Sequence, residues 1–227
     1  MDLGDDKQTD LGDESCFSHK DVAALNARAR ELFGVRIHGR GGQGVVTAAE
    51  LLSVAAFGDG RHAQAFPSFG SERTGAPVVA FCRIASGPIR TREPVTDPDA
   101  LVVQDPTLLH QVDLFSGLRP EGYVLINTSR NVDELGLAEF SRRFLEGRLL
   151  TVPATELAIA HTGRPMPNAV MLGGFAALTG AVSLDSVLVA IRERFSGNTA
   201  DANAAAAAEA FEVVLKERKE LVGAPPA

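Results

Sequence analysis

The sequence predicts an α/β protein: a largely parallel sheet with helices on both faces, followed by a helical C-terminal third. Three observations lead to this fold class. Residues 35–57 have the pattern of a strand, a glycine-rich loop and a helix, the opening unit of a doubly wound fold. Short apolar strands then alternate with helical segments up to residue 152. From residue 168 onward, helical segments follow one another with no strand between them.

The individual elements follow from apolar runs and the turn residues between them. The first strand spans 35–38, and the helix after the glycine loop spans 45–57 because it is rich in Ala, Leu and Glu. Further strands are expected at 61–66, 78–84, 100–103, 122–127 and 149–152. Further helices are expected at 107–114, at 132–144, after Pro153, and at 168–179, 184–195 and 199–218.

The chain divides into an extension, one domain and a tail. Residues 1–33 form the extension: their first part is rich in Asp, Gly, Ser and Thr, which predicts disorder, and residues 21–32 are expected to be helical. Ser18 or Asp21 would cap that helix, and Gly34 would end it. Residues 34–220 form a single α/β domain, and residues 221–227 form a frayed tail.

Composition excludes several function classes. The 227 residues carry a net charge of −7 with no Lys/Arg-rich run, no Trp and one Tyr, which argues against nucleic-acid binding. Cys16 and Cys82 are too few for a disulfide framework or for an Fe–S cluster, which takes about four ligands. The N-terminus has no signal-peptide pattern, and no apolar stretch is long enough to cross a membrane. We therefore expect a cytoplasmic protein with no membrane contact.

The glycine loop is the first candidate site. It comprises Gly39, Arg40, Gly41, Gly42, Gln43 and Gly44, and Val45 opens the helix behind it. Its Gly-x-Gly-x-x-Gly spacing matches the dinucleotide fingerprint, in which glycines let the backbone approach a phosphate and the helix N-terminus supplies free N–H groups. Arg40 would add a formal charge. An NAD site also requires an acid after the second strand, but the sequence there is Ala65-Phe66-Pro67. We expect a phosphate-bearing ligand; the alternative is a turn that only packs helix against strand.

A second polar stretch follows the strand expected at 61–66. It contains Ser68, Phe69, Gly70, Ser71, Glu72 and Arg73 and runs on to Pro77. If this strand runs parallel to the first, the stretch lies beside the glycine loop, because loops at the carboxyl ends of strands line the ligand crevice. The alternative is a solvated surface loop. Asn168 begins a later helix and is expected to cap it.

The sequence contains none of the patterns that carry catalysis on their own. It has no Gly-x-Ser-x-Gly, no His-Glu-x-x-His and no Walker loop, and His38 and His161 have no companions at metal-ligand spacing. Gly58-Asp59-Gly60 begins like a thiamine diphosphate motif but lacks the Asn required downstream, so we expect it to end a helix. No catalytic residue and no metal ligand are assigned to this chain.

Three separated motifs, in order, resemble one known family. The segment 35–46, the loop 66–79 and the run from Pro167 and Asn168 to Gly174 are similar to the gamma subunit, or gamma domain, of the pyruvate/2-oxoacid:acceptor oxidoreductases. The similarity covers residues 34–215. This sequence departs from the family's Tyr/Phe-Gly-x-Glu-x-Arg-Gly loop at one point, since Arg73 directly follows Glu72.

The resemblance implies a function. Such enzymes oxidatively decarboxylate 2-oxoacids, usually to acyl-CoA, carbon dioxide and two electrons. It implies that thiamine diphosphate, Mg and [4Fe-4S] clusters sit on partner subunits and that ferredoxin or another acceptor takes the electrons. It further implies that the gamma component has a Rossmann-like fold without nicotinamide and is associated with CoA access, so the glycine loop would hold CoA or shape the interface near thiamine.

Two other readings of the chain remain open at this point, a stand-alone dinucleotide-binding module and a purely structural subunit. The 2-oxoacid is also open, since pyruvate, branched-chain, aromatic and phenylglyoxylate-type acids all fit the resemblance.

Overall fold

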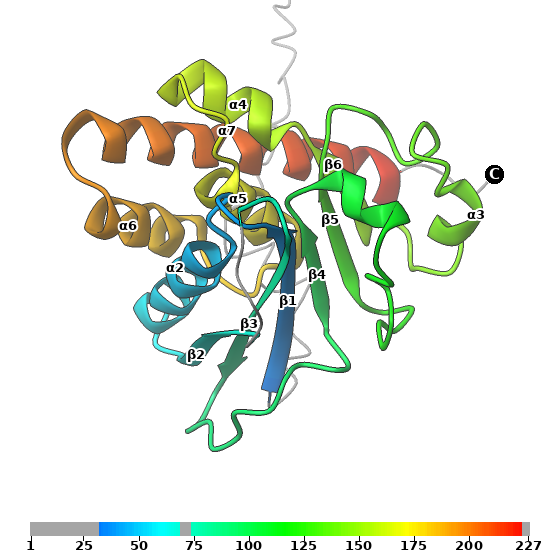
Figure 1. The fold of residues 1–227 in the computed structure, drawn as a ribbon, viewed down its shortest axis with the longest axis horizontal. Helices are drawn as coiled ribbons and strands as arrows, with labels where there is room; N and C mark the ends of the chain where they lie inside the picture. The colour runs from blue at the N-terminus through cyan, green and yellow to red at the C-terminus, as the bar shows by residue number, and fades with distance from the viewer. Residues whose placement is uncertain (1–31, 69–73, 224–227) are drawn as a thin grey trace, which may run out of the picture.

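A six-stranded mixed sheet forms the centre of the molecule (Figure 1). The structure is a computed structural model and describes residues 32–68 and 74–223. In the order β2-β3-β1-β4-β5-β6, the strands are His62–Pro67, Pro77–Ala85, Leu32–Arg40, Ala100–Val103, Tyr123–Asn127 and Leu149–Val152. β1, β4, β5 and β6 pair in parallel, whereas β3 runs antiparallel to both of its neighbours, β1 and β2. The prediction of a largely parallel sheet is confirmed.

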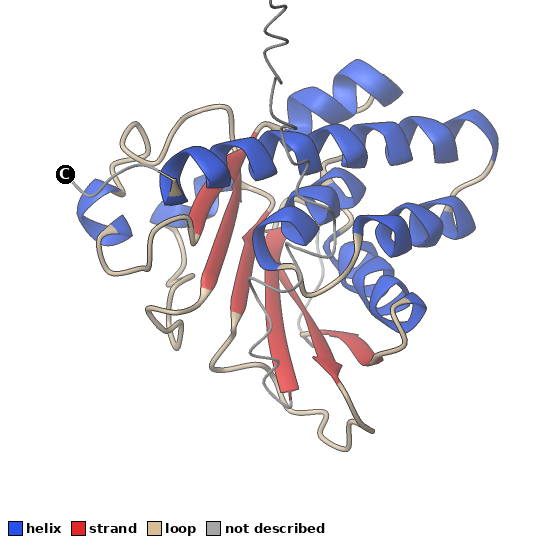
Figure 2. Cartoon of the chain, turned by 180° about the vertical axis from the view of Figure 1, so that it is seen from behind, coloured by secondary structure: helices blue, strands red, loops and turns tan. Residues whose placement is uncertain are grey.

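The long helices lie on one face of this sheet. They are α2 (Val45–Gly58), α4 (Ala154–Thr162), α5 (Asn168–Thr179), α6 (Leu184–Arg194) and α7 (Gly197–Val222). α2, α5 and α7 contact the strands, and α4 and α6 pack on these helices. Because side chains alternate along a strand, Ile37 and Val102 join the large core under these helices. α7 crosses the strand direction (Figure 2). The predicted helical C-terminal third is confirmed, because α5, α6 and α7 follow one another with no strand between them.

The opposite face carries short helices and loops. Leu101 and Val103 pack there against Leu108 in a smaller core. Its cover includes the 3₁₀ helix η1 (Pro106–His110) and the single-turn helix α3 (Ala138–Ser141). Both faces of β4 and β5 are thus buried, which explains why β4 is apolar throughout and β5 is apolar from Val124 to Ile126.

The long helices predicted at 107–114 and 132–144 are wrong in extent. After η1 the chain leaves the helical path, because the Arg36 guanidinium of β1 donates to the backbone carbonyls of Leu114 and Ser116 at 2.8 and 2.6 Å. In the second segment Gly136 adopts a φ of 73°, a left-handed conformation that interrupts a helix. Helix propensity was overridden by tertiary bonds in one case and by a turn in the other.

The start of the domain also differs from the expectation. β1 begins at Leu32, where the predicted N-terminal helix was to end, because Leu32 pairs with Ala85 and extends the ladder with β3. The remainder of that helix and the predicted disordered extension lie outside the described residues. Within residues 32–68 and 74–223, no helix is long and apolar enough to span a membrane.

Candidate ligand site at the glycine loop

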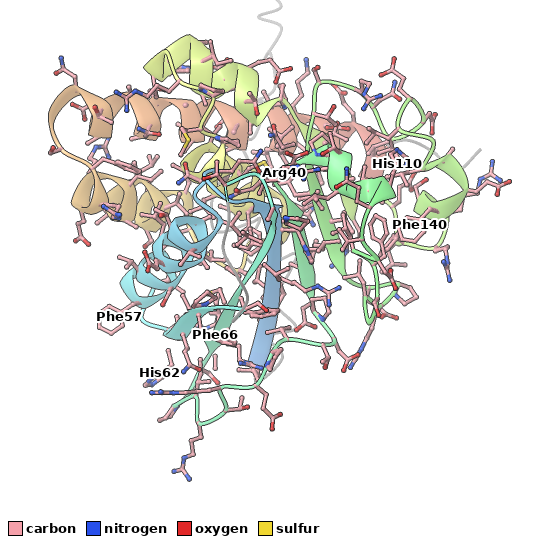
Figure 3. The ribbon with its side chains drawn as sticks, in the orientation of Figure 1. Arg40, Phe57, His62, Phe66, His110 and Phe140 are labelled. Carbon is pink, nitrogen blue, oxygen red and sulfur yellow. The ribbon has the colours of Figure 1, made fainter. Side chains whose placement is uncertain are left out.

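The glycine loop leaves the carboxyl end of β1 and enters α2, between the neighbouring strands β3 and β4. Figure 3 labels Arg40 at this edge of the sheet. Gly44 is the N-cap of α2 with a φ of 70°, no side chain caps the helix, and its first turn contains no acid. The first N–H groups of a helix have no intrahelical acceptor, so this end presents donors and a partial positive charge.

Two glycines of the fingerprint, Gly39 and Gly44, are needed for close packing. A Cβ at Gly39 would lie 2.6 Å from Cγ2 of Val45, so this glycine lets helix and strand pack closely. A Cβ at Gly44 would lie 2.5 Å from Nδ2 of Asn168. Gly42 lies next to the fingerprint position Gly41 and has a φ of 97°. It is exposed, and a Cβ at this position would have no heavy atom within 4 Å. The loop is therefore both a packing device and an open surface.

An aspartate that the sequence analysis did not single out organises the loop. Asp105 Oδ2 accepts hydrogen bonds from Arg40 Nε at 3.2 Å and from Gln43 Nε2 at 2.9 Å. Gln43 Oε1 in turn accepts a hydrogen bond from the Arg40 backbone N at 2.7 Å, so this side chain links the loop backbone to Asp105. Burial raises the pKa of Asp105, but hydrogen bonds from Thr107 and Gln43 outweigh it, so the pKa lies below its ordinary value.

Arg40 fastens the glycine loop to two other segments. Its Nη1 donates to the Gly75 carbonyl at 3.0 Å, and its Nη2 donates to Thr107 Oγ1 at 2.7 Å and Gln111 Oε1 at 2.9 Å. Together with the Asp105 contact, these bonds occupy the guanidinium on several sides. The charge of Arg40 is thus partly compensated by groups of the protein itself, which the sequence analysis did not anticipate.

The described end of the second polar stretch, residues 74–77, lies beside the glycine loop. Gly41 N donates to the Ala76 carbonyl at 2.9 Å, and Gly75 N donates to the Gly41 carbonyl at 3.0 Å. The route differs from the expectation, since β3 lies between β1 and β2 and the loop closes a β2–β3 hairpin. Ser68 follows β2, and its N–H donates to the Val79 carbonyl at 2.8 Å. Phe69, Gly70, Ser71, Glu72 and Arg73 lie outside the described residues.

Asn168 belongs to the site but does not cap its helix. Pro167 occupies the cap position of α5, and no side chain caps that end. The cap prediction is therefore wrong. Asn168 is instead the buried first residue of the helix and packs directly on Gly44. Only Gly fits there, because a side chain at residue 44 would collide with the Asn168 amide.

Two amides at the ends of β4 and β5 complete this edge, and sequence reasoning missed both. Asn127 Nδ2 donates to the Gln104 carbonyl at 2.7 Å and to Thr155 Oγ1 at 2.8 Å, and its Oδ1 accepts from Thr155 N at 3.0 Å. Gln104 is 1% exposed, and its side-chain amide has no hydrogen-bond partner within the described part of the chain. The available signal was their position: Gln104 directly follows apolar β4, and Asn127 is the last residue of β5.

The thiamine-like segment ends a helix, as expected. Asp59 is the C-cap residue of α2, and its carboxylate accepts hydrogen bonds from the N–H and Oγ of Ser183 and from Oγ of Ser186 at the start of α6. In residues 32–68 and 74–223, no three His, Cys, Asp or Glu side chains gather as a metal site would require.

Residues 34–213 match the family described as pyruvate ferredoxin/flavodoxin oxidoreductase. The chain belongs to this family. It is 50% identical over 178 residues to pyruvate synthase subunit PorC of Methanothermobacter marburgensis, a match that covers 78% of this chain and 95% of the relative. It is 47% identical over 178 residues to the pyruvate/ketoisovalerate oxidoreductases common subunit gamma of Pyrococcus abyssi, covering 78% and 95%.

A crystal structure in the pyruvate ferredoxin/flavodoxin oxidoreductase family has the same fold. Pyruvate oxidoreductase subunit PORC of Thermotoga maritima superposes with a TM-score of 0.68 at 34% identity, covering 81% of this chain and 97% of that one. The resemblance to gamma-type members of this family is confirmed by all three relatives.

Proposed function

We propose that this chain serves as the gamma subunit of a 2-oxoacid:ferredoxin oxidoreductase complex and holds the diphosphate of CoA at the N-terminus of α2. The complex oxidatively decarboxylates a 2-oxoacid to an acyl-CoA in the cytoplasm. Thiamine diphosphate, Mg and [4Fe-4S] clusters sit on its partner subunits. The observation that carries the proposal is the uncapped, acid-free helix end behind an exposed Gly42.

The geometry suits a diphosphate. A helix N-terminus binds anions through its free N–H groups and its dipole, and a glycine at the contact lets the ligand come close to the backbone. Asp105 is the carboxylate that bonds the loop, and its charge is offset by Arg40 and by the Gln43 amide. The positive end of α2 is therefore available to an incoming phosphate.

A dinucleotide is disfavoured by the end of β2. The ribose of NAD requires an acidic side chain there, and β2 ends in Phe66 and Pro67. The choice of 2-oxoacid belongs to the other subunits under this proposal. The name of the Pyrococcus abyssi relative, a gamma subunit common to pyruvate and ketoisovalerate enzymes, supports that division of labour.

A charge placed in the first turn of α2 tests the proposal. Thr47 is the half-buried third residue of this helix. Thr47→Glu puts a negative charge where the diphosphate is expected, yet an acid in the first turn favours the helix itself. In the assembled complex, we expect the KM for CoA to rise on the order of tenfold, because a repulsion of about 1.4 kcal/mol is a factor of ten.

Thr47→Gln is the matched control, because glutamine has the size of glutamate but carries no charge. Its KM for CoA should stay near that of the unsubstituted complex, and the KM for the 2-oxoacid should change in neither variant. Equal KM values for CoA in the Glu and Gln variants would leave the α2 terminus as a structural turn and overturn the proposal.

A further inference from the structure

A hollow of about 500 Å³ lies between the segment around α3 and the C-terminal end of α7. These two elements lie at the same side of the molecule in Figure 1 and, seen from behind, in Figure 2. None of the described residues that line the hollow belongs to the candidate ligand site at the glycine loop. Its apolar walls are Val132, Phe144, Leu145, Leu149 and Leu221.

The rim of the hollow exposes large apolar side chains. Leu145 and Leu221, which line it, are 54% and 38% exposed. Val222 is 58% exposed and packs at the rim, since a Cβ added to Gly147 would lie 2.9 Å from its Cγ2. Single exposed apolar side chains are ordinary, but several at one place mark a surface that another protein covers.

One carboxylate in the hollow lacks a partner. Glu217 of α7 is half-buried, and its side chain makes no hydrogen bond or ion pair within the described part of the chain. Burial, reinforced by the charge of Glu220, raises the pKa of the Glu217 carboxyl above its ordinary value. A half-buried carboxylate without a partner costs free energy, and a cation brought into the hollow reduces that cost.

The charges around the hollow select the kind of group that fits it. Of the described residues in its lining, Asp133, Glu146 and Glu217 are acidic and Arg142 is basic. A basic group therefore complements this surface, and its attraction to the carboxylates fixes the register of a partner.

The chain itself is a poor source of that group. It carries a net charge of −7, so a second copy brings charge of the same sign. Residues 1–31 contain eight Asp or Glu against four Lys or Arg, and residues 224–227 contain no basic side chain. The complement of the hollow is thus a basic group on a different protein.

We propose that this hollow docks a partner subunit that inserts an arginine beside Glu217, an inference that rests on the proposed role of the chain as a subunit. The arginine stem lies along the apolar wall of Leu145 and Leu221, and its guanidinium pairs with the carboxylate. An arginine in a pocket with an apolar rim is a common anchor of protein–protein interfaces.

Association of the full chain with its partner subunits, measured as a Kd by calorimetric titration, tests the inference. In Glu217→Lys a second cation meets the inserted arginine, so the Kd should rise about tenfold or more. Glu217→Gln should also raise the Kd, yet the melting temperature of the free chain should not fall, because the substitution removes a carboxylate that has no partner there.

Glu212→Lys is the matched control. Glu212 is an exposed glutamate of the same helix and is not among the described residues that line the hollow. Its Kd should equal that of the unsubstituted chain. An unchanged Kd in Glu217→Lys overturns the inference. Self-association of the chain that Glu217→Lys abolishes also overturns it, since the occupant would then be a second copy.

Thr47→Glu separates the two proposals, because it changes the expected CoA site and leaves the docking surface intact. If Thr47→Glu raises the KM for CoA while Glu217→Lys leaves the Kd unchanged, only the assignment of the docking surface is wrong. If the unsubstituted chain associates with no partner subunit, the proposed function itself is contradicted.

Discussion

His38 shows at the scale of one residue how position decides chemistry. It lies on β1 next to the glycine loop, but it faces the side of the sheet away from α2. Burial, reinforced by the charge of Arg36, lowers its pKa to about 4. His38 is 7% exposed, and its Nε2 has no hydrogen-bond partner in the described part of the chain. It is a neutral core residue at pH 7.

This histidine makes folding sensitive to mild acid. Its pKa falls from 6.5 in the unfolded chain to about 4 in the folded one, so the unfolded state takes up the proton first as the pH drops. The contribution of His38 to the unfolding free energy is therefore present above pH 6.5 and is lost as the pH falls toward 4. We expect about 2 kcal/mol of unfolding free energy to disappear between about pH 7 and pH 5.

Urea unfolding of the purified chain at both pH values measures this loss. His38→Gln does not titrate in that range, so the difference between the two pH values should shrink in the variant, whatever its absolute stability. A difference of the same size in both proteins would show that another group is responsible.

At the scale of elements, the contact between α5 and α7 depends on one glycine. A Cβ at Gly173 would lie 1.8 Å from the carbonyl oxygen of Ala207, a backbone atom that cannot move alone. A Cβ at the next residue, Gly174, would meet only side-chain atoms, the nearest those of Leu125 and Val214, each at 3.1 Å. The alanine run of α7 supplies the small side chains that let the two helices approach.

Gly173→Ala and Gly174→Ala therefore form a matched pair. We expect Gly173→Ala to lower the unfolding free energy by about 3 kcal/mol, the upper end of overpacking costs, because the helices must separate. Gly174→Ala should change it by less than about 1 kcal/mol, since side chains can adjust and alanine favours the helix. Denaturant titration of the two variants compares them, and equal losses would contradict the close backbone approach.

At the scale of the whole molecule, the sheet topology assembles the candidate ligand site. Its polar groups converge on one edge of the sheet, where Gly42, Arg40, Asp105 and Asn127 come from successive parallel strands. Such an edge positions ligands in open α/β folds. The described residues hold no cluster of metal-ligating side chains. Under the proposed function, oxidation of the 2-oxoacid takes place on partner subunits.

The purified chain should accordingly show no reduction of ferredoxin or of a dye with any 2-oxoacid. Addition of its partner subunits should restore activity, and partner subunits without this chain should show a raised KM for CoA. Activity of the chain alone would contradict its assignment as a non-autonomous subunit.

The amino-acid sequence by itself determined the elements whose signals are local. The apolar runs predicted β4 and β6 at their observed bounds. The strand–glycine–helix pattern predicted the turn into α2, although β1 continues through Gly39 to Arg40. These signals depend on turn residues and on apolar runs, which a chain carries wherever it folds. The same local reasoning failed at 107–114, where Arg36 of a distant strand takes the carbonyls.

Tertiary structure alone decided which residues contact one another at the candidate site. Asp105 reaches Arg40 and Gln43 because β4 pairs in parallel with β1, and Asn168 reaches Gly44 because α5 packs beneath α2. These contacts join residues far apart in the chain and leave no periodic trace in the sequence. Strand order and helix packing create them, so they become visible only once the sheet is assembled.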